Sequence, residues 1–439
     1  MFRYYLKLGA LSIRANPALS ILMVLAIAVG IGACMTIVTV KHVMSDNPIA
    51  HKNDVLYHVQ VDNWSPAEPY QDPDKPPEQM TYLDAKALYD AGKAFRQVTS
   101  YKTSRVVQPE GEGARPFQLE ARATTADFFP MFDVPFLYGS PWDRASDDAE
   151  ERVTVLSQEL NEQLFGGEDS TGRMLTINGE EYRVSCVLDE WTPVPKFYDL
   201  NNNPYEAPEA LYLPFSLAAT NGFSRSGNTS CWKPVADGGF EEFLASECIW
   251  IQMWIELRDA SEKEGYLQFL DAYAEEQKAL GRFQRPLNNR LNTPSEWLAD
   301  QEVVDDNVNV LLSIAVLFLL VCLLNTIGLL LAKIMRRAKD ISLRRALGAS
   351  KRTLFVQYII EAGMIGTAGG LLGVGATWLG LRGIENLWSD YDFIQYLVRM
   401  DWSMVLLAVV LAVFSALAAA MYPTWRACNI TPASQLRIQ

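Results

Sequence analysis

Four long apolar stretches alternate with polar segments along the chain. They cover residues 18–40, 308–332, 354–381 and 402–421. Each is close to the roughly 20 residues that a helix needs to cross the hydrocarbon core of a bilayer. One such stretch could be a buried helix of a large soluble protein, but four of them in one chain predict four transmembrane helices.

The first stretch also has to be distinguished from a signal peptide. Its apolar core is about 23 residues long, whereas that of a signal peptide is roughly 7–15 residues long. No cleavage site with small residues at alternating positions follows it. We therefore interpret this stretch as a retained membrane span.

The polar insert between the first two stretches, residues 44–306, alternates between strand and helix patterns. Strand patterns occur at 54–62, 153–156 and 248–258, and helix patterns occur at 81–95, 158–165 and 262–280. Asn178-Gly179 lies between two further strand patterns, and this dipeptide is the strongest short signal for a hairpin. The insert is therefore predicted to be an α+β domain.

Basic residues indicate the side of the membrane on which each loop lies. The 333–353 loop contains eight Lys and Arg residues against one acid, and further basic residues precede the first stretch and follow the last. By the positive-inside rule, this loop and both termini are expected in the cytoplasm. Residues 44–306 and 382–401 are then expected outside.

The net charge of −14 divides unevenly between the two sides. Residues 44–306 contain 22 Lys and Arg against 46 Asp and Glu, a net charge of −24, and the remainder has a net charge of +10. An acidic outer domain argues against a nucleic-acid partner.

The predicted fold is thus a membrane protein with four transmembrane helices and a large α+β domain inserted between the first two. In chain order we expect an interfacial N-terminal helix (1–17), a first span (18–43), the outer domain (44–306), a second span (307–333), a cytoplasmic loop (334–353), a third span (354–381), a short outer loop (382–401), a fourth span (402–422) and a cytoplasmic tail (423–439).

The sequence contains no recognisable catalytic or metal site. His42, His51 and His58 are the only histidines, and packing or surface roles are favoured over metal ligation for them. The G-x-S-x-G, H-E-x-x-H and C-x-x-C patterns are missing, and 91–95 lacks most of the phosphate-binding loop pattern that it faintly resembles. The chain is therefore predicted to be no enzyme and to hold no metal or nucleotide of its own.

Three of the six cysteines fall in the predicted outer domain, at positions 186, 231 and 248. A disulfide between Cys231 and Cys248 is compatible with an oxidising compartment. Three cysteines do not define a disulfide framework, so the sequence leaves this pairing open.

The basic loop contains a short helix pattern, "DISLRRALGAS" (340–350). Asp340 is expected to cap its start, and Gly348 is expected to follow its last residue. Leu343 and Leu347 are four residues apart and form an apolar pair on one face. This pattern fits a positive anchor at the membrane interface, and it equally fits a helix that docks into a groove of a cytoplasmic protein.

The segment "DISLRRALGASKRTLFVQYIIEAGMIGTAGGLLGVG" (340–375) resembles the signature of the FtsX-type permease domain. The outer segments "ADFFPMFDVPFLYGSPW" and "VTVLSQELNEQLFGGEDSTGRMLTINGEEYRVSCVL" are similar to the periplasmic core domain of MacB-like permeases. The segments that open and close the chain also fit, so the resemblance covers nearly its whole length in the right order.

This resemblance implies a permease subunit of a type VII ABC transporter in the bacterial inner membrane. Its large domain is then periplasmic, and two permease subunits pair, identical or homologous. MacB itself has an ATPase fused to its N-terminus, whereas this chain starts with the first span, so the ATPase dimer, with its ATP and Mg²⁺, is expected on a separate chain. The movement that ATP drives would be transmitted to the outer domain, an action called mechanotransmission.

The resemblance also assigns roles to single residues. The coupling helix that contacts the ATPase would comprise Asp340, Ile341, Ser342, Leu343, Arg344, Arg345, Ala346, Leu347 and Gly348. Asp340 and Ser342 replace the usual Glu and Gly of the family pattern.

Within the third span, Glu361 is expected to be a structural or coupling partner, since an intramembrane carboxylate needs a functional reason. A face of small residues would allow close helix approach, either within one subunit or between two. Its glycines are Gly363, Gly366, Gly369, Gly370 and Gly373. Near the N-terminus, Phe2, Tyr5, Leu6, Gly9 and Ile13 form the apolar face of a predicted interfacial helix.

The expected function is export from the periplasm together with a periplasmic adaptor and an outer-membrane channel. One alternative is a lipoprotein-releasing permease of the LolC/LolE kind, for which an apolar groove in the outer domain is expected. Another is an FtsX-like regulator of cell-wall hydrolases, although such regulators have a much smaller outer domain. The sequence does not identify the cargo.

Overall fold

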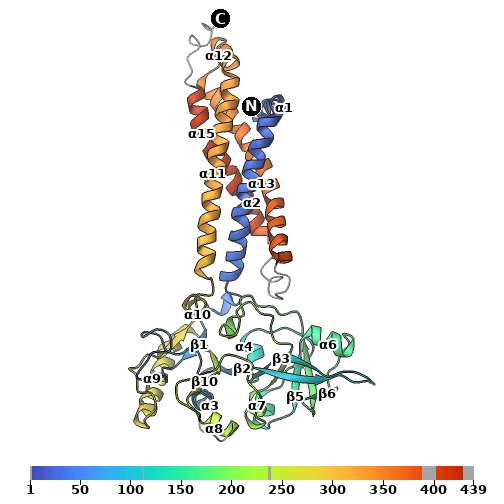
Figure 1. Cartoon of the computed structure of the whole chain (residues 1–439), viewed down its shortest axis with the longest axis vertical. Coiled ribbons are helices and arrows are strands. Elements are labelled where there is room, and N and C mark those ends of the chain that lie inside the picture. Colours follow the sequence, from blue (N-terminus) through green and yellow to red (C-terminus); the bar gives the residue numbers. More distant parts are fainter. Residues whose placement is uncertain (1, 112, 236–238, 388–401, 429–439) are drawn as a thin grey trace. The chain divides into compact units, whose positions relative to one another are not determined.

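The computed structural model describes residues 2–111, 113–235, 239–387 and 402–428. The chain separates into two compact units (Figure 1). The helical unit consists of Met1–Ser45 together with Val304–Gln439, and the sheet unit consists of Asp46–Val303. The sheet unit is thus an insert between two parts of the helical unit.

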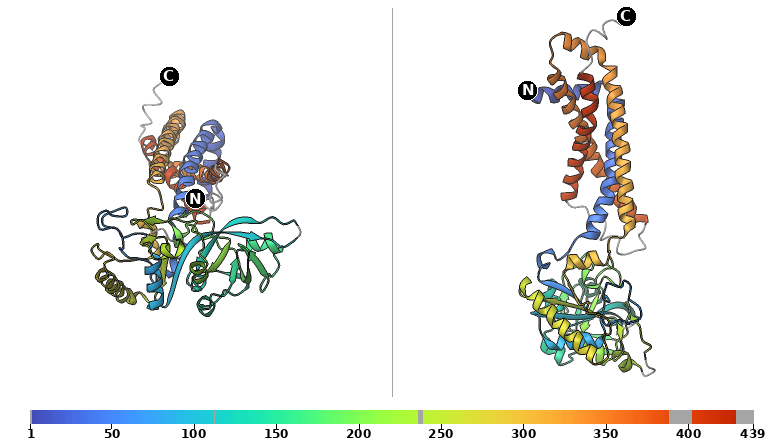
Figure 2. Two further views of the ribbon diagram at one scale, coloured as in Figure 1. Left: turned by 60° about the horizontal axis from the view of Figure 1, so that its bottom comes forward. Right: turned by 90° about the vertical axis from the view of Figure 1, so that its left-hand side faces the viewer.

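Four helices of the described chain are long and apolar enough to cross a membrane. They are α2 (Pro17–Ser45), α11 (Asp306–Arg336), α13 (Lys351–Leu387) and α15 (Trp402–Cys428). Each contains one of the four predicted apolar stretches. They run side by side (Figures 1 and 2), with α13 packed against α2 and α15, and α11 packed against α2.

Each of the four helices extends beyond its predicted span, most clearly at the C-terminal ends of α13 and α15. Helix α13 continues through 382–387, which were expected to be loop, and α15 continues through Pro423 to Cys428. A proline within a membrane helix is tolerated where neighbouring groups satisfy the freed backbone carbonyls, so it is a weak stop signal there. The remainder of the predicted outer loop, 388–401, and of the tail, 429–439, lies outside the described residues.

The sheet unit contains a mixed ten-stranded sheet with the order β12-β1-β11-β2-β3-β8-β5-β7-β4, in which β6 pairs with β2 and β7. Its strands are β1 (Leu56–Gln60), β2 (Arg96–Gln108), β3 (Phe117–Thr124), β4 (Phe136–Gly139), β5 (Val153–Leu156), β6 (Met174–Ile177), β7 (Glu180–Leu188), β8 (Leu211–Pro214), β11 (Gln252–Glu256) and β12 (Arg290–Asn292). A separate pair is formed by β9 (Ser230–Cys231) and β10 (Cys248–Ile249).

Helices connect these strands. They are α3 (Tyr82–Ala91), α4 (Phe128–Met131), α5 (Arg144–Asp148), α6 (Gln158–Phe165), α7 (Phe215–Thr220), α8 (Phe240–Leu244), α9 (Lys263–Ala279) and α10 (Pro294–Asp300). Two apolar clusters form the core of the unit, and Tyr212 and Leu213, adjacent in β8, belong to different clusters. Because successive strand residues point to opposite faces, both faces of the sheet are buried.

Local sequence signals account for several of these elements. Strand β5 and helix α6 have the predicted bounds. Helix α6 begins where the Ser157 hydroxyl accepts from the Leu160 N–H, and it ends at Gly166, whose φ of 67° is unstrained only in glycine. The hairpin at Asn178-Gly179 is also confirmed, with β6 and β7 paired across it.

The predicted single strand at 248–258 is wrong. The segment forms β10 and β11, which pair with different strands: Cys248 lies opposite Cys231 in β9, and Gln252 lies opposite Ser100 in β2. Trp250 and Ile251 lie between the two strands and are buried in the core. The apolar pattern therefore reflects the burial of two short strands and of the residues between them.

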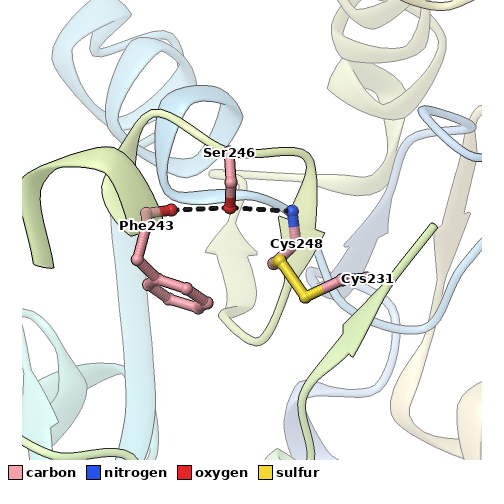
Figure 3. Close-up of a disulfide and its surroundings, with 4 residues drawn as sticks. All are labelled: Cys231, Phe243, Ser246 and Cys248. Atoms are coloured by element: carbon pink, nitrogen blue, oxygen red, sulfur yellow. Dashed lines mark hydrogen bonds between the residues drawn. A yellow bond between two sulfur atoms is a disulfide. The ribbon is translucent and has the colours of Figure 1, made fainter. Parts of the chain in front are cut away.

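The structure joins Cys231 and Cys248 by a disulfide (Figure 3). The turn that leads into β10 is held by Ser246, whose hydroxyl donates to the Phe243 carbonyl at 2.6 Å and accepts from the Cys248 N–H at 3.2 Å. Cys186, the third cysteine of the sheet unit, is a buried thiol. The crosslink thus joins β9 covalently to β10.

A buried histidine predicts how the sheet unit responds to acid. His58 on β1 stacks on Trp297 with ring centroids 3.8 Å apart, and its Nε2 lies 3.1 Å from the Gln252 Oε1. Burial disfavours the imidazolium and lowers the pKa of His58 from 6.5 to about 4. The unfolded chain therefore binds a proton more readily, so the free energy of unfolding decreases as the pH falls from 6.5 towards 4.

We expect acidification from pH 7.5 to 5 to cost the sheet unit about 2 kcal/mol through this group. Unfolding in urea at both pH values, followed by tryptophan fluorescence, would measure the loss. The His58→Gln variant should lose less stability than the wild type over the same interval. Equal losses in the wild type and His58→Gln would contradict the prediction.

Candidate functional site

The basic segment at 340–350 is largely the short helix α12 (Ala338–Ala346). The prediction that Asp340 caps it is wrong, because the helix starts two residues earlier and Arg337 is the N-cap residue. Asp340 lies in the first turn, where the positive end of the helix dipole still stabilises its carboxylate. The sequence could not locate this start, because α11 ends immediately before it.

The end of α12 is as predicted. Gly348 has a φ of 100° and follows the C-cap residue Leu347. Its N–H donates to the Arg345 carbonyl at 3.1 Å, and the Ala349 N–H donates to the Arg344 carbonyl at 3.0 Å. These two bonds form a Schellman motif, in which glycine satisfies the last carbonyls of a helix.

One side of α12 is anchored to the helical unit. Ile341 is buried in a small apolar cluster with Ile334, Leu354 and Cys428. Ser342 is also buried, and its hydroxyl has no hydrogen-bond partner among the residues that the structure describes. This is the position at which the family pattern has glycine.

Two arginines add polar contacts to this anchorage. The Arg344 Nη1 donates to the Gln357 Oε1 at 3.4 Å, and the Arg345 Nη1 donates to the Cys428 carbonyl at 3.3 Å. Both contacts join α12 to the membrane-length helices. The helix is therefore held in place along its inner side.

The opposite side of α12 carries the predicted leucine pair. Leu343 is 54% exposed and Leu347 is 80% exposed, although both are large apolar residues. The remaining predicted contact residues, Asp340, Arg344, Ala346 and Gly348, are also exposed, and Arg345 is half-buried. An anchored helix thus presents two leucines with basic residues beside them.

A polar cluster lies inside the helical unit, centred on Glu361 of α13. The Glu361 Oε1 lies 2.5 Å from the Lys333 Nζ and accepts from the Ser12 hydroxyl at 2.7 Å. Lys333 also donates to the Ser20 hydroxyl at 2.9 Å. Lys333 and Glu361 are almost fully buried, and their opposite charges offset the cost of placing either one alone in this environment.

The structure thereby identifies the partner that the sequence could not name. Lys333 lies in the last turn of α11 together with Arg336, and the pattern only marked it as one of many basic loop residues. Ser12 carries no signal in the sequence beyond its place in the N-terminal helix. Both contacts depend on how the helices pack.

The glycines of α13 pack against two helices of the same chain. A Cβ on Gly366 or Gly370 would lie 2.6 or 2.9 Å from an alanine Cβ of α15, and one on Gly369 or Gly373 would lie 2.7 or 3.0 Å from an isoleucine of α2. These four glycines therefore serve packing within the subunit. Gly363 is less crowded, with its nearest neighbour 3.8 Å away.

The N-terminal helix α1 (Phe2–Ala15) packs against α13. Gly9 is buried there, since a Cβ would lie 2.9 Å from the Met364 Sδ. Tyr5, Leu6 and Ile13 are half-buried, and Arg3 and Lys7 are exposed, so the predicted apolar face is confirmed for the side chains that the structure describes. The Phe2 side chain lies outside them.

The histidines do not form a metal site in the described chain. His51 lies 2.7 Å from the Asp133 carboxylate, and His58 is buried against Trp297. Among the described residues, no group of three or more His, Cys, Asp or Glu side chains is arranged to hold a metal ion. The candidate site is therefore α12 with its anchors.

Comparison with known families agrees with this architecture. Residues 20–264 match the MacB-like periplasmic core domain, and residues 312–432 match the FtsX-like permease C-terminal domain. The chain belongs to the MacB-like ABC transporter permeases. The permease is accordingly a multi-pass membrane protein, and its family implies an ATPase partner.

Two relatives differ in how much of their own length the permease matches. It is 22% identical over 446 residues to the ABC transporter permease YknZ of Bacillus subtilis, a match that covers 99% of this chain and 98% of YknZ. It is 23% identical over 382 residues to the macrolide export ATP-binding/permease protein MacB of Rhodospirillum rubrum, covering 84% of this chain. The match spans only 51% of that MacB protein, about half its length.

Among solved structures, a MacB domain is similar to part of this chain. The periplasmic region of MacB from Actinobacillus actinomycetemcomitans aligns with 57% of this chain and 94% of its own, at 13% identity and a TM-score of 0.35.

Proposed function

We propose that this permease couples ATP hydrolysis by a separate ATPase to movement of its sheet unit. The ATPase docks on α12, and the four long helices transmit the movement. The single observation that carries the proposal is the exposed pair Leu343 and Leu347 on a helix whose other side is anchored. Exposed apolar residues with a polar rim are typical of protein-binding surfaces.

The location of the ATPase follows from charge and from the relatives. The basic residues around α12 support, by the positive-inside rule, a cytoplasmic location for this end of the helical unit and for both termini. The sheet unit then lies in the periplasm of a bacterial inner-membrane protein. The match to nearly the whole of a relative named as a permease supports an ATPase on another chain.

The work that we propose is export from the periplasm. A second permease subunit, a periplasmic adaptor and an outer-membrane channel would complete the machine. The MacB relative is named for macrolide export, which supports this direction. For lipoprotein release an apolar groove is expected, whereas two cavities of about 250 Å³ in the sheet unit have mixed linings that include carboxylates such as Asp147 and Glu78.

The test is purification of the tagged full chain from its native membrane in mild detergent. A P-loop ATPase should accompany the wild type and be lost from the Leu343→Glu/Leu347→Glu variant, because two buried carboxylates at a docking surface would be unpaired. Leu280→Glu, at a leucine that is 70% exposed in the sheet unit, is the matched control and should retain the ATPase. If the wild type brings no ATPase, or the docking variant retains it, the proposal fails.

A further inference from the structure

Arg337 connects the start of α12 to the end of α1. Its Nη1 donates to the Ser12 hydroxyl at 2.5 Å, and its Nη2 donates to the Ser12 carbonyl at 3.1 Å. With the amide oxygen of Asn16 turned towards the guanidinium, Asn16 accepts from Nη2 at 2.9 Å and from Nε at 3.2 Å. One side chain thus makes several bonds to a segment more than 300 residues away.

These bonds suit the chemistry of the α1 end. The last carbonyls of a helix have no partner within it, and a cation near them is favoured by the helix dipole. Ser12 lies in the last turn of α1, and Arg337 is the N-cap residue of α12. The guanidinium therefore satisfies the end of one helix while it occupies the entry to the next.

The contact continues into the membrane-length helices. The Ser12 hydroxyl accepts from Arg337 and donates to Glu361, which in turn is paired with Lys333. A hydroxyl can accept and donate in this way at the same time. A single polar chain thereby joins α12, α1, α13 and α11.

The Arg337 contact, with its several bonds, differs from the other anchors of α12, which are apolar packing and the bonds of Arg344 and Arg345 at 3.4 and 3.3 Å. Burial of Ala338 and Ile341 holds the helix against the unit, but apolar contacts are non-directional. A guanidinium with several bonds fixes orientation as well as distance. The orientation of α12 determines where Leu343 and Leu347 point.

We propose that Arg337 is a positioning residue that fixes α12 to α1, so that the two helices present the leucine pair to the ATPase as one rigid body. This inference rests on the proposed function. It assigns to α1, which does not carry the leucine pair, a role in coupling ATP hydrolysis to movement. Loss of Arg337 should then leave ATPase binding largely intact and impair coupling.

The first test needs no ATPase. A spin label at Leu347→Cys in the full chain, reconstituted in lipid nanodiscs, reports the motion of α12, and the free cysteines of the described chain are buried. Arg337→Met should make the label clearly more mobile, and Arg337→Lys should restore part of the order. Arg336→Met, at an exposed neighbouring arginine, is the matched control and should leave the label unchanged.

The second test measures ATP hydrolysis by the complex that co-purifies with the unlabelled chain. Arg337→Met should lower kcat by about fivefold or more, in the range of typical coupling between sites, with an unchanged KM for ATP. Arg337→Lys should recover part of kcat. The Leu343→Glu/Leu347→Glu variant should instead lose the ATPase itself.

The outcomes separate the two proposals. Label mobility and kcat that match the Arg336→Met control would overturn the positioning role, even if the ATPase docks on α12. A wild type without any ATPase would overturn the proposed function, and the label would still decide whether Arg337 fixes α12 to α1. An unchanged label in Arg337→Met would overturn that link in either case.

Discussion

Replacement of Arg122 by methionine is expected to destabilise the sheet unit by about 3–5 kcal/mol. Arg122 lies on β3 and is fully buried, as are its two acidic partners, Asp199 and Glu209. Its Nε donates to the Glu209 Oε2 at 2.9 Å and its Nη2 to the Oε1 at 2.6 Å, and Asp199 also accepts from Nη2. Lys196 adds a second buried cation, 3.3 Å from Glu209.

The size of the effect follows from what the substitution leaves behind. Burial alone would raise the pKa of Glu209, but Arg122 and Lys196 hold it well below its ordinary value, so the folded unit keeps a carboxylate ionised in its core. Without Arg122 that charge loses its principal partner. The stability provided by the lowered pKa is present above the ordinary pKa of glutamate and is lost as the pH falls below it.

Denaturant unfolding of the full chain, followed by tryptophan fluorescence, would measure the change. Arg152→Met is the matched control, because Arg152 is about half exposed and pairs with Glu180 at 3.0 Å on the surface, where such pairs contribute about 0–1 kcal/mol. Neutralising the acids as well, in Arg122→Met/Asp199→Asn/Glu209→Gln, should recover part of the loss. A small loss of stability in Arg122→Met alone would contradict the prediction. It would show that water or a rearrangement takes the place of Arg122 beside the two acids.

Replacement of Gly366 by leucine is expected to cost the helical unit about 3 kcal/mol, at the upper end of typical overpacking penalties. A Cβ there would lie 2.6 Å from the Ala416 Cβ, 3.0 Å from the Val413 Cα and 3.2 Å from the Ala412 carbonyl oxygen. Two of these atoms belong to the backbone of α15, which cannot move aside as a side chain can. Helix α15 must therefore separate from α13.

Thermal unfolding in detergent, scored by the fraction that remains monodisperse after heating, would detect this loss. Gly375→Leu provides a control in the same helix, since a Cβ on Gly375 would have no neighbour within 4 Å in the described part of the chain. Equal stability of the two variants would show that α13 and α15 are not packed as described. A larger loss for Gly366→Leu is the expected outcome.

The apolar pattern by itself determined the four long helices and the position of the insert. Burial in a membrane requires about 20 apolar residues in succession, and this requirement is visible without knowledge of the neighbours. Short-range chemistry likewise determined α6, which starts at Ser157 and ends at Gly166, and the hairpin at Asn178-Gly179. In each case the signal and the structure lie within a few residues of one another.

Part of the candidate site was accessible for the same reason. Leu343 and Leu347 are one helical turn apart, so any helix over this segment places them on one face. The sequence could not determine that this face is exposed while Ile341 is buried. The predicted start of α12 was also wrong. Arg337 both ends α11 and begins α12, so no side-chain cap marks this start in the sequence.

Only the tertiary structure decided which charges meet. Ser12 and Glu361 are 349 residues apart, and Arg337 reaches Ser12 across 325 residues. Arg122 and Glu209 are 87 residues apart and on different segments of the sheet unit. Periodicity describes the face of one element at a time, whereas these contacts depend on how separate elements pack. The burial that gives these charges a large effect on stability exists only once the elements have packed.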